Sequence, residues 1–458
     1  MADQALMKQM MDAVDAAHDE IVELCQEIVR VPSVSFGDPD SGDELPAAEL
    51  IQAKLAKDGI EADIYKPRPN RGNLIANYDK DKKDASPSLL LMSHTDVVPV
   101  EDESQWTYPP FGAEIHDNRI YGRGAADMKG TVASQAMALI LLKRAGVELD
   151  GRLTFATCAD EETGGVYGFG WQVENHPETL KADYAVNEGG GDPTHGAAGM
   201  IYEIATGEKG RLEMHFHVAG KGFHASQPWR ADNAIYKAQE LIRRIQNYEP
   251  EVSVEAEIFG HLDKLAGLDE EVTVDNLEEI LERVGKSNYS LASKLRACSR
   301  MTLVASMMNA GVKSNSVAEN CTIVCDVRSL PSQDKAYVEA QAAKIAEGID
   351  GVTFHVHETS ISNASSFDSP FRSNVEEATR AALGYDDITF LPGLTVGFTD
   401  SRLVRPLGNT IYGFTPSHPD DDPSLSGAHN INESLGIETL ILRTKYHIAL
   451  ALSTLQKS

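Results

Sequence analysis

The sequence predicts an α/β fold, with a mostly parallel sheet flanked by helices and a second, α+β domain inserted into it. Between residues 85 and 205, short apolar stretches alternate with helical ones, an order typical of βαβ units. Beyond Thr206 the stretch GRLEMHFHVAGKG alternates polar and apolar residues, like a strand with one face in water. We therefore expect residues 1–207 and 362–458 to form one domain and residues 208–361 to form the inserted one.

The elements of the first domain follow from the spacing of apolar residues. The N-terminal stretch up to residue 31 spaces them three and four apart, which predicts an amphipathic helix. The predicted strands are SLLLMSHTDVV, RLTFATCA and DYAVNEGG, and the helices between them are GTVASQAMALILLKRAG and YGFGWQVENHPETL. Near the end of the chain, RSNVEEATRAALG and GIETLILRTKYHIALALSTLQ predict two more helices that rejoin this sheet.

The inserted domain combines strands with helices. A helix is predicted at residues 232–246, and the charged stretch 268–299 predicts extra helices. The strand CTIVCDVRSL, the helix DKAYVEAQAAKIAEG and the strand VTFHVHE would complete a small α+β domain.

Charge and cysteine content exclude several classes of partner. The chain of 458 residues has 41 lysines and arginines against 70 acids, a formal net charge of -29, which repels nucleic acid and anionic membrane surfaces. We find no run of 18 apolar residues and no signal-peptide pattern, so we expect a cytoplasmic protein without a membrane segment. The five scattered cysteines are expected to be reduced core thiols.

Acids and histidines follow three of the predicted strands, at the sheet edge where parallel α/β proteins bind ligands. With two further residues in loops, the set is His94 and Asp96, Asp160 to Glu162, Glu188, Asp127 in a glycine-rich turn, and His429 before the last helix. Each acid alone would more often cap a helix or a turn. Together they form a nitrogen and oxygen ligand set that suits paired zinc, manganese or cobalt ions.

Four runs of the sequence, HTDVVP, YGRGAADMKG, DEETGG and HNINES, resemble the dinuclear zinc peptidase and deacylase superfamily. That superfamily includes carboxypeptidase G, succinyl-diaminopimelate desuccinylase, acetylornithine deacetylase and the aminoacylases. The order and spacing of the runs match over nearly the whole chain. The resemblance implies a dizinc exopeptidase-like catalytic domain and identifies the inserted domain as a lid that also mediates dimerisation.

The resemblance implies two divalent metal ions, zinc in the first place, with manganese or cobalt as alternatives. It assigns His94 and Glu188 to one ion, Glu162 and His429 to the other, and Asp127 to both as a bridge. In the superfamily the peptide bond after the bridging aspartate is often cis, so we expect a cis bond between Asp127 and Met128.

The resemblance also separates a base from a ligand among the adjacent acids. Glu161 would be the general base that takes a proton from a water between the two ions, while Glu162 holds a metal. This explains why a buried strand ends in neighbouring carboxylates. Asp96 would hydrogen-bond the second ring nitrogen of His94, although a plain turn-capping role is its alternative.

The substrate side of the site would come from the lid. GKGFHASQP resembles the segment whose histidine, here His224, stabilises the oxyanion. GVKSNSVAENCTIVCDVRSLP resembles the segment whose asparagine and arginine, here Asn315 and Arg328, hold the free carboxylate of the substrate. Without the resemblance, His224 would be a structural histidine and Arg328 an ordinary exposed strand residue. Phe398, in VGFTDSR, stands where a small residue is expected, so it would narrow the acyl pocket.

The sequence therefore predicts a metal-dependent amidohydrolase that cleaves N-acyl amino acids or short peptides with a free carboxylate. GVKSN, FTDSR and the enlarged lid favour the long-lid branch that contains Gly-X carboxypeptidase and N-acyl-amino-acid hydrolases. A dipeptidase or carboxypeptidase-type exopeptidase is the alternative, and a desuccinylase or deacetylase of amino-acid biosynthesis fits less well. A catalytically silent binding protein on the same fold is disfavoured, because a base that binds no metal has no use there. In the superfamily, lids pair across a two-fold axis, which predicts a homodimer in which His224 serves the neighbouring site.

Overall fold

The computed structural model describes residues 3–38 and 41–456, and the chain divides into two compact units. Unit 1 comprises residues 1–206, 365–393 and 399–458, and unit 2 comprises residues 207–364 and 394–398. The short stretch 394–398, which the sequence analysis placed with the catalytic domain, groups with unit 2. Its backbone explains why, because the N–H of Lys209 donates to the carbonyl oxygen of Thr395 at 2.9 Å.

The main sheet has a parallel centre and antiparallel margins. Its central order is β6 (Arg152–Cys158), β3 (Ser88–His94), β7 (Tyr184–Asn187) and β16 (Thr410–Gly413), which are all parallel to one another. Further strands extend both sides. Those that pair antiparallel are β1 (Ala62–Arg68), β2 (Arg71–Asn77), β8 (Pro193–Gly196), β9 (Gly199–Glu208) and β14 (Asn363–Ala364), and β15 (Thr389–Thr395) pairs with β9. The predicted α/β class and its parallel core are confirmed. The predicted pattern did not include the antiparallel margins.

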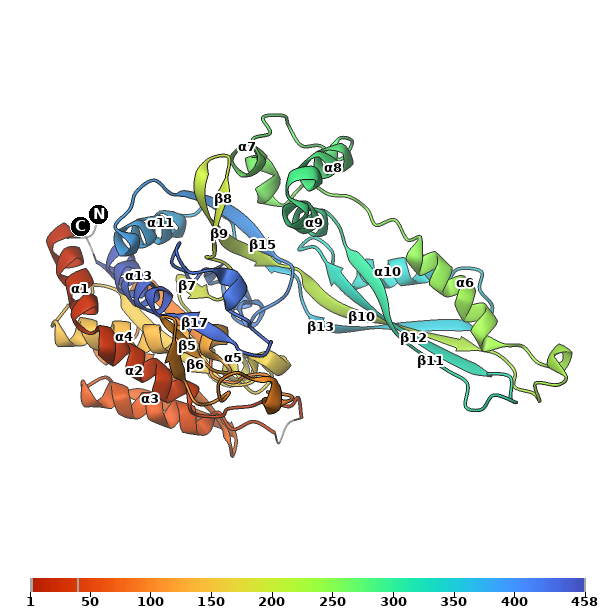
Figure 1. Cartoon of the computed structure of the whole chain (residues 1–458), viewed down its shortest axis with the longest axis horizontal. Coiled ribbons are helices and arrows are strands. Elements are labelled where there is room, and N and C mark those ends of the chain that lie inside the picture. The colour runs from red at the N-terminus through yellow and green to blue at the C-terminus, as the bar shows by residue number, and fades with distance from the viewer. Residues whose placement is uncertain (1–2, 39–40, 457–458) are drawn as a thin grey trace. The chain divides into compact units, whose positions relative to one another are not determined.

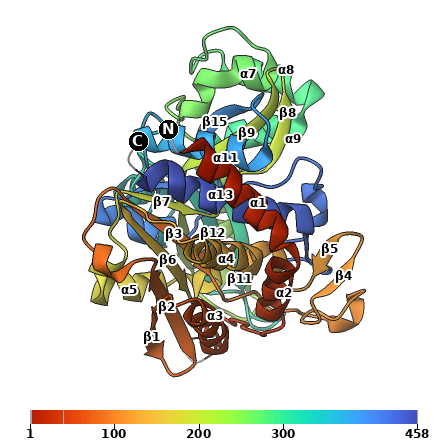
Figure 2. The ribbon, with the colours of Figure 1, turned by 90° about the vertical axis from the view of Figure 1, so that its left-hand side faces the viewer.

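Helices cover both faces of the central strands (Figure 2). One face of β3, which carries Leu89 and Leu91, shares a core with α1 (Gln4–Ala16), α2 (His18–Val29), α3 (Leu45–Lys57), α4 (Gly130–Arg144), α11 (Pro370–Leu383) and α13 (Ile437–Leu455). The opposite face, with Leu90 and Met92, packs against α5 (Phe169–Asn175) and α12 (Ser401–Val404). Burial on both faces explains why these strands are continuously apolar in sequence.

The predicted N-terminal helix is two helices, α1 and α2, which meet at Ala17. The break turns the chain so that Val14 of α1 and Ile21 of α2 are both fully buried in the same core. A small separate sheet of β4 (Glu114–His116), β5 (Arg119–Tyr121) and β17 (Ser434–Gly436) joins the approach to α4 to the start of α13.

Unit 2 is built on a four-stranded antiparallel sheet (Figure 1). Its order is β11 (Thr302–Ala310), β12 (Asn320–Ser329), β10 (Gly210–Ala219) and β13 (Val352–Ser360). Alternate residues of β10 and β12 pack against α6 (Ala234–Gln246) and α10 (Lys335–Ala346). Among the described residues of this unit, no helix covers the other face of the sheet. The extra helices predicted for residues 268–299 are α8 (Leu277–Ser287) and α9 (Tyr289–Cys298). The short helix α7 (Leu262–Ala266), which precedes that stretch, and the strand β11 were not predicted.

Among the residues that the structure describes, we find no helix that combines the length and the apolar character needed to cross a bilayer.

Candidate metal centre and active site

The five predicted metal ligands all belong to unit 1, and three of them follow strands of its central sheet. His94 is the last residue of β3, Glu188 directly follows β7, and Glu162 lies four residues beyond the end of β6. Because the carboxyl ends of parallel strands meet at one edge of the sheet, these three side chains share that edge. Asp127 lies in the short helical segment Ala125–Lys129 before α4, and His429 lies in the loop before β17.

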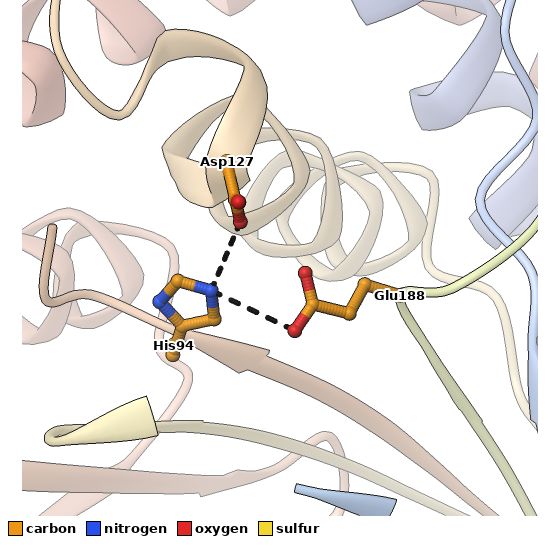
Figure 3. Close-up of side chains that lie close together, drawn as sticks. All are labelled: His94, Asp127 and Glu188. Atoms are coloured by element: carbon orange, nitrogen blue, oxygen red, sulfur yellow. Dashed lines mark hydrogen bonds and ion pairs between the residues drawn. The ribbon is translucent and has the colours of Figure 1, made fainter. Parts of the chain in front are cut away.

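The five side chains form two groups that share Asp127. In the first, Nε2 of His94 lies 3.2 Å from Oδ1 of Asp127 and 3.7 Å from Oε1 of Glu188 (Figure 3). In the second, Nε2 of His429 lies 3.2 Å from Oδ2 of Asp127 and 3.1 Å from Oε2 of Glu162. Each oxygen of Asp127 therefore faces a different histidine, which is the arrangement of a carboxylate that bridges two ions.

The separations between these ligand atoms fit metal ions. Ligand atoms about 2.1 Å from a tetrahedral zinc ion lie roughly 3.4 Å from one another. The four nitrogen-to-oxygen distances above fall between 3.1 and 3.7 Å. Mixed imidazole and carboxylate ligands suit zinc, manganese or cobalt. The peptide bond between Asp127 and Met128 is cis, as the resemblance implies.

The charges in the centre also favour divalent cations. Burial and then the nearby carboxylate of Asp127 raise the pKa of Glu188 to about 7. Burial opposes ionisation of Asp127, but hydrogen bonds from His429 and His94 outweigh it and hold the pKa of Asp127 well below its usual range. Together with Glu162, these residues bring three carboxylates into the centre, and two histidines cannot neutralise them. Two divalent ions would supply the missing positive charge.

Glu161 lies beside the ligand groups without belonging to either. It is 8% exposed, and burial followed by repulsion from Glu188 raises its pKa well above the usual range. A raised pKa makes a carboxylate a stronger proton acceptor, which suits a group that must accept a proton and then give it up.

Asp96 holds the backbone that carries both glutamates. The N–H of Glu161 donates to Oδ1 of Asp96 at 3.0 Å, and the N–H of Glu162 donates to Oδ2 at 3.1 Å. The ring nitrogen Nδ1 of His94 lies 3.1 Å from the backbone oxygen of Asp96 and 3.5 Å from its Oδ1. Asp96 thus orients His94 mainly through its own backbone oxygen, while its carboxylate holds the backbone N–H groups of the two glutamates.

A buried ion-pair cluster, which the sequence analysis missed, supports the same loop. Arg71 is nearly fully buried, and its Nη1 lies 3.0 Å from Oε1 of Glu44 and 3.0 Å from Oδ1 of Asp160. Asp160 has the left-handed backbone angle φ 71°, which is costly for a residue other than glycine. Its Oδ2 also accepts the N–H of Tyr167 at 2.9 Å. Arg71 therefore fixes the residue directly before Glu161.

Replacing Arg71 with methionine should destabilise the protein by about 3 kcal/mol or more, because it leaves two carboxylates buried without their cation. Denaturant unfolding monitored by circular dichroism measures the loss. Lys8→Ala is the matched control, since the Lys8–Asp12 pair is exposed on a helix and its loss should leave the midpoint unchanged. Equal midpoints for Arg71→Met and the wild type would mean that the cluster adds nothing to stability.

Two further buried acids were also missed, and one of them supports the centre. Oε1 of Glu433 accepts the N–H groups of Ala126 and Asp127 at 3.0 and 3.1 Å, so it fixes the turn that presents the bridging carboxylate. Asp400 is 1% exposed, and neither of its carboxylate oxygens has a hydrogen-bond partner among the described residues. It packs so closely on Gly165 that a Cβ there would lie 2.4 Å from Oδ1 of Asp400. HNINES and VGFTDSR contain these acids, but only the fold shows what they contact.

The predicted substrate residues all belong to unit 2, and that unit separates them. His224 is exposed and forms a bridge with Ser316, and the N–H of Ala225 donates to the carbonyl oxygen of Asn315 at 2.9 Å. His224 and Asn315 thus lie on adjacent loops before the start of β12. Arg328 lies near the far end of that strand, at roughly 3.3 Å per residue about 25 Å beyond Asn320. The structure brings His224 and Asn315 together and keeps Arg328 apart from them.

Arg328 lies on the sheet face that no helix of unit 2 covers. Its Nε donates to Oδ1 of Asp326 at 2.9 Å, and its side chain is 27% exposed. Arg211 lies directly opposite Arg328 on β10. Phe398, the residue expected to narrow an acyl pocket, is partly buried in the stretch 394–398 of the same unit.

Comparison with known proteins gives one family and a consistent set of relatives. The family model described as peptidase family M20/M25/M40 matches residues 90–453. A probable succinyl-diaminopimelate desuccinylase of Staphylococcus epidermidis is 26% identical over 388 residues, covering 83% of this chain and 85% of that protein. Its identity is too low to transfer a substrate.

Solved structures share the fold over nearly their whole length. An M20 family metallo-carboxypeptidase of Sulfolobus solfataricus, Sso-CP2, matches with a TM-score of 0.72 and 22% identity, covering 95% of this chain and 99% of that one. The di-peptidase Dug1p of Saccharomyces cerevisiae matches with a TM-score of 0.65 and 15% identity, covering 98% of each chain. At these identities the likeness establishes the fold, and the chemistry must be argued from the site.

Proposed function

Because the chain belongs to peptidase family M20/M25/M40 and is therefore a metal-dependent hydrolase, we propose that it cleaves the amide bond of N-acyl amino acids or short peptides with a free carboxylate. The observation that carries the proposal is the pair of ligand groups joined by Asp127, with the buried Glu161 beside them. This arrangement places a proton acceptor next to a two-ion centre.

The residues of this chain divide the reaction between them. Two divalent ions held by the ligand groups that share Asp127 would supply the Lewis acidity that lowers the pKa of a water and polarises the amide carbonyl. Glu161 takes a proton from the water as the water oxygen bonds to the carbonyl carbon. As the carbon–nitrogen bond breaks, Glu161 gives that proton to the leaving amine. His224 donates a hydrogen bond to the carbonyl oxygen while negative charge develops there.

Zinc is our first choice of metal, with manganese or cobalt as alternatives, because two imidazoles and three carboxylates form the ligand set. We place the protein in the cytoplasm, since all five cysteines are buried thiols that form no disulfide. We also propose that Phe398 narrows the acyl pocket.

Peptide substrates are the alternative, because an exopeptidase would use the same ions and the same base. Two of the structural neighbours are named as a metallo-carboxypeptidase and a di-peptidase, so their names indicate peptide substrates for those two proteins. A screen of N-acyl amino acids and dipeptides against the zinc- and manganese-loaded protein tests the proposal. Higher kcat/KM for N-acyl amino acids supports it, and activity confined to dipeptides would establish the exopeptidase instead. No hydrolysis of either class would overturn both.

We expect Arg328 to bind the substrate carboxylate. Arg328→Ala should therefore lower kcat/KM for substrates with a free carboxylate, by an amount equivalent to about 2–5 kcal/mol of transition-state stabilisation. Amidated analogues should be hydrolysed at nearly the wild-type rate constant. Arg211→Ala is a matched control, because Arg211 lies opposite Arg328 and contacts the same Asp326. A loss of equal size on both kinds of substrate would show that Arg328 has only a structural role.

We propose that the protein is a homodimer with shared active sites. The structure of unit 2 supports this, because a chain that places His224 and Asn315 far from Arg328 cannot direct all three at one small substrate. Two chains can, if His224 and Asn315 of one serve the site that contains Arg328 of the other.

Mixing inactive variants tests the shared site. His224→Ala and Glu161→Ala should each be nearly inactive as homodimers, but their hybrid keeps one site in which both residues are intact. Re-associated hybrids should therefore recover up to about half of the wild-type activity per dimer if the sites act independently.

A second pair of variants is the control for this experiment. A hybrid of His224→Ala with Asn315→Ala has one damaged residue in each site and should recover nothing. Hybrids of His224→Ala with Glu161→Ala that are verified by mass and still inactive would mean that His224 serves its own chain or has no catalytic role.

A further inference from the structure

The open face of the unit 2 sheet carries a cluster of histidines outside the predicted active site. Four of the 14 histidines of the chain, His215 and His217 on β10 and His355 and His357 on β13, lie on these two adjacent strands. Residues of β10 alternate between the helix-covered core and this face, so Glu213, His215 and His217 share it.

The strand register brings the rings together. His215 lies directly opposite His355, and His357 lies opposite Glu213. The ring centroids of His215 and His355 are 4.6 Å apart, and those of His217 and His355 are 5.3 Å apart, both pairs being stacked. His355 therefore lies next to both histidines of β10.

A carboxylate orients one of these rings. Oε2 of Glu213 lies 2.9 Å from Nε2 of His215. In protein metal sites, a ligating histidine commonly donates its second ring N–H to a carboxylate, which fixes the tautomer and makes the other nitrogen a better ligand. Here that contact occupies Nε2 of His215 and leaves Nδ1 with its lone pair for a ligand.

We propose that His215, His217 and His355 bind one divalent transition-metal ion, with Glu213 as the carboxylate that orients His215. Imidazole nitrogens select zinc, nickel or copper over calcium and magnesium, which prefer oxygen ligands. This site is independent of the proposed hydrolytic function.

Binding requires the rings to turn, because stacked rings do not direct their nitrogens at one point. His217 and His355 are exposed, so their side chains can change rotamer without opening a core. Opposed residues on antiparallel strands have Cα atoms about 5 Å apart, and alternate residues of one strand are about 7 Å apart. From such positions three imidazoles can reach a common ion.

The surrounding charges of unit 2 do not repel a cation. On this face Asp326 and Glu213 lie beside Arg211, and Asp326 pairs with Arg328. Two acids thus balance two arginines.

The test is a zinc titration of protein that already carries the ions of the unit 1 centre, followed by isothermal calorimetry and elemental analysis. The wild type should bind one further equivalent. His355→Asn and His217→Asn should lose it while keeping the first ions and the hydrolytic activity. Glu213→Gln should weaken the extra ion about 10-fold or more. His195→Asn, a change of an exposed histidine on β8, is the control and should behave as the wild type.

Two results would overturn the proposal. The first is a zinc-loaded wild type that takes up no further ion at millimolar zinc. The second is an extra ion that persists in His355→Asn with unchanged affinity, which would place it elsewhere on the protein. Circular dichroism and retained activity of the variants exclude misfolding as the cause of a lost ion.

Discussion

Glu161→Gln should lower kcat by about 10²-fold or more while the protein keeps its full complement of metal. Glutamine has nearly the same size and shape but cannot accept the proton of the attacking water. The change leaves His94, Asp127 and Glu188 untouched, and the backbone N–H of residue 161 can still donate to Asp96. Steady-state kinetics on the best substrate from the screen, together with elemental analysis of the same preparation, measures both quantities.

The neighbouring variant Glu162→Gln is the control, since it removes a charged ligand and should lower metal content as well as activity. The two variants change adjacent residues, one proposed as the base and the other as a metal ligand. If Glu161→Gln loses metal and Glu162→Gln keeps it, the base and the ligand have been assigned the wrong way round. If Glu161→Gln keeps both its metal and its full turnover, Glu161 is not the base, and a different proton acceptor must be sought.

The sheet edge that forms the candidate centre could be predicted from sequence because its chemistry is local. His94, Glu162 and Glu188 each stand at or just after an apolar strand, and strands that are buried on both faces are continuously apolar. Parallel strands place such residues at one edge without any further information. The resemblance of short runs then supplied Asp127 and His429, which no strand pattern would have singled out.

The supporting cluster could not be predicted, because its members come from distant segments and no periodicity links them. Arg71 is at the start of β2, Glu44 precedes α3, and Asp160 follows β6, so only the folded chain shows that they meet. A lone arginine before a strand is normally a surface residue. Glu433 is similar, because its contact with the N–H of Asp127 joins positions more than 300 residues apart.

The separation within unit 2 was missed for a different reason. In the sequence, Asn315 and Arg328 lie 13 positions apart and belong to one run that resembles a substrate-binding segment. A turn between them would bring them together, whereas an extended strand moves them apart. Most of the interval is β12, whose length follows from its pairing with both β10 and β11. Because β12 is extended, the two residues predicted to hold one carboxylate lie apart within a single chain. This separation is the physical argument for an active site shared between two chains.

Removing the bridging carboxylate, Asp127→Ala, should have the largest effect of all, because both groups of ligands contain it. Each ion would lose one ligand, and the two histidines would lose the anion that lies 3.2 Å from each of them. The wild type should bind about two zinc equivalents per chain, and the variant fewer, with activity reduced on the order of 10³-fold or more because water is no longer activated.

Asp422→Asn, a change of an exposed acid, is the control and should keep two ions. Chelation of the wild type should reproduce the loss, and added zinc should restore activity to the wild type but not to Asp127→Ala. A variant that still holds two ions with wild-type affinity would show that Asp127 does not bridge them, and the two histidines would then belong to separate sites.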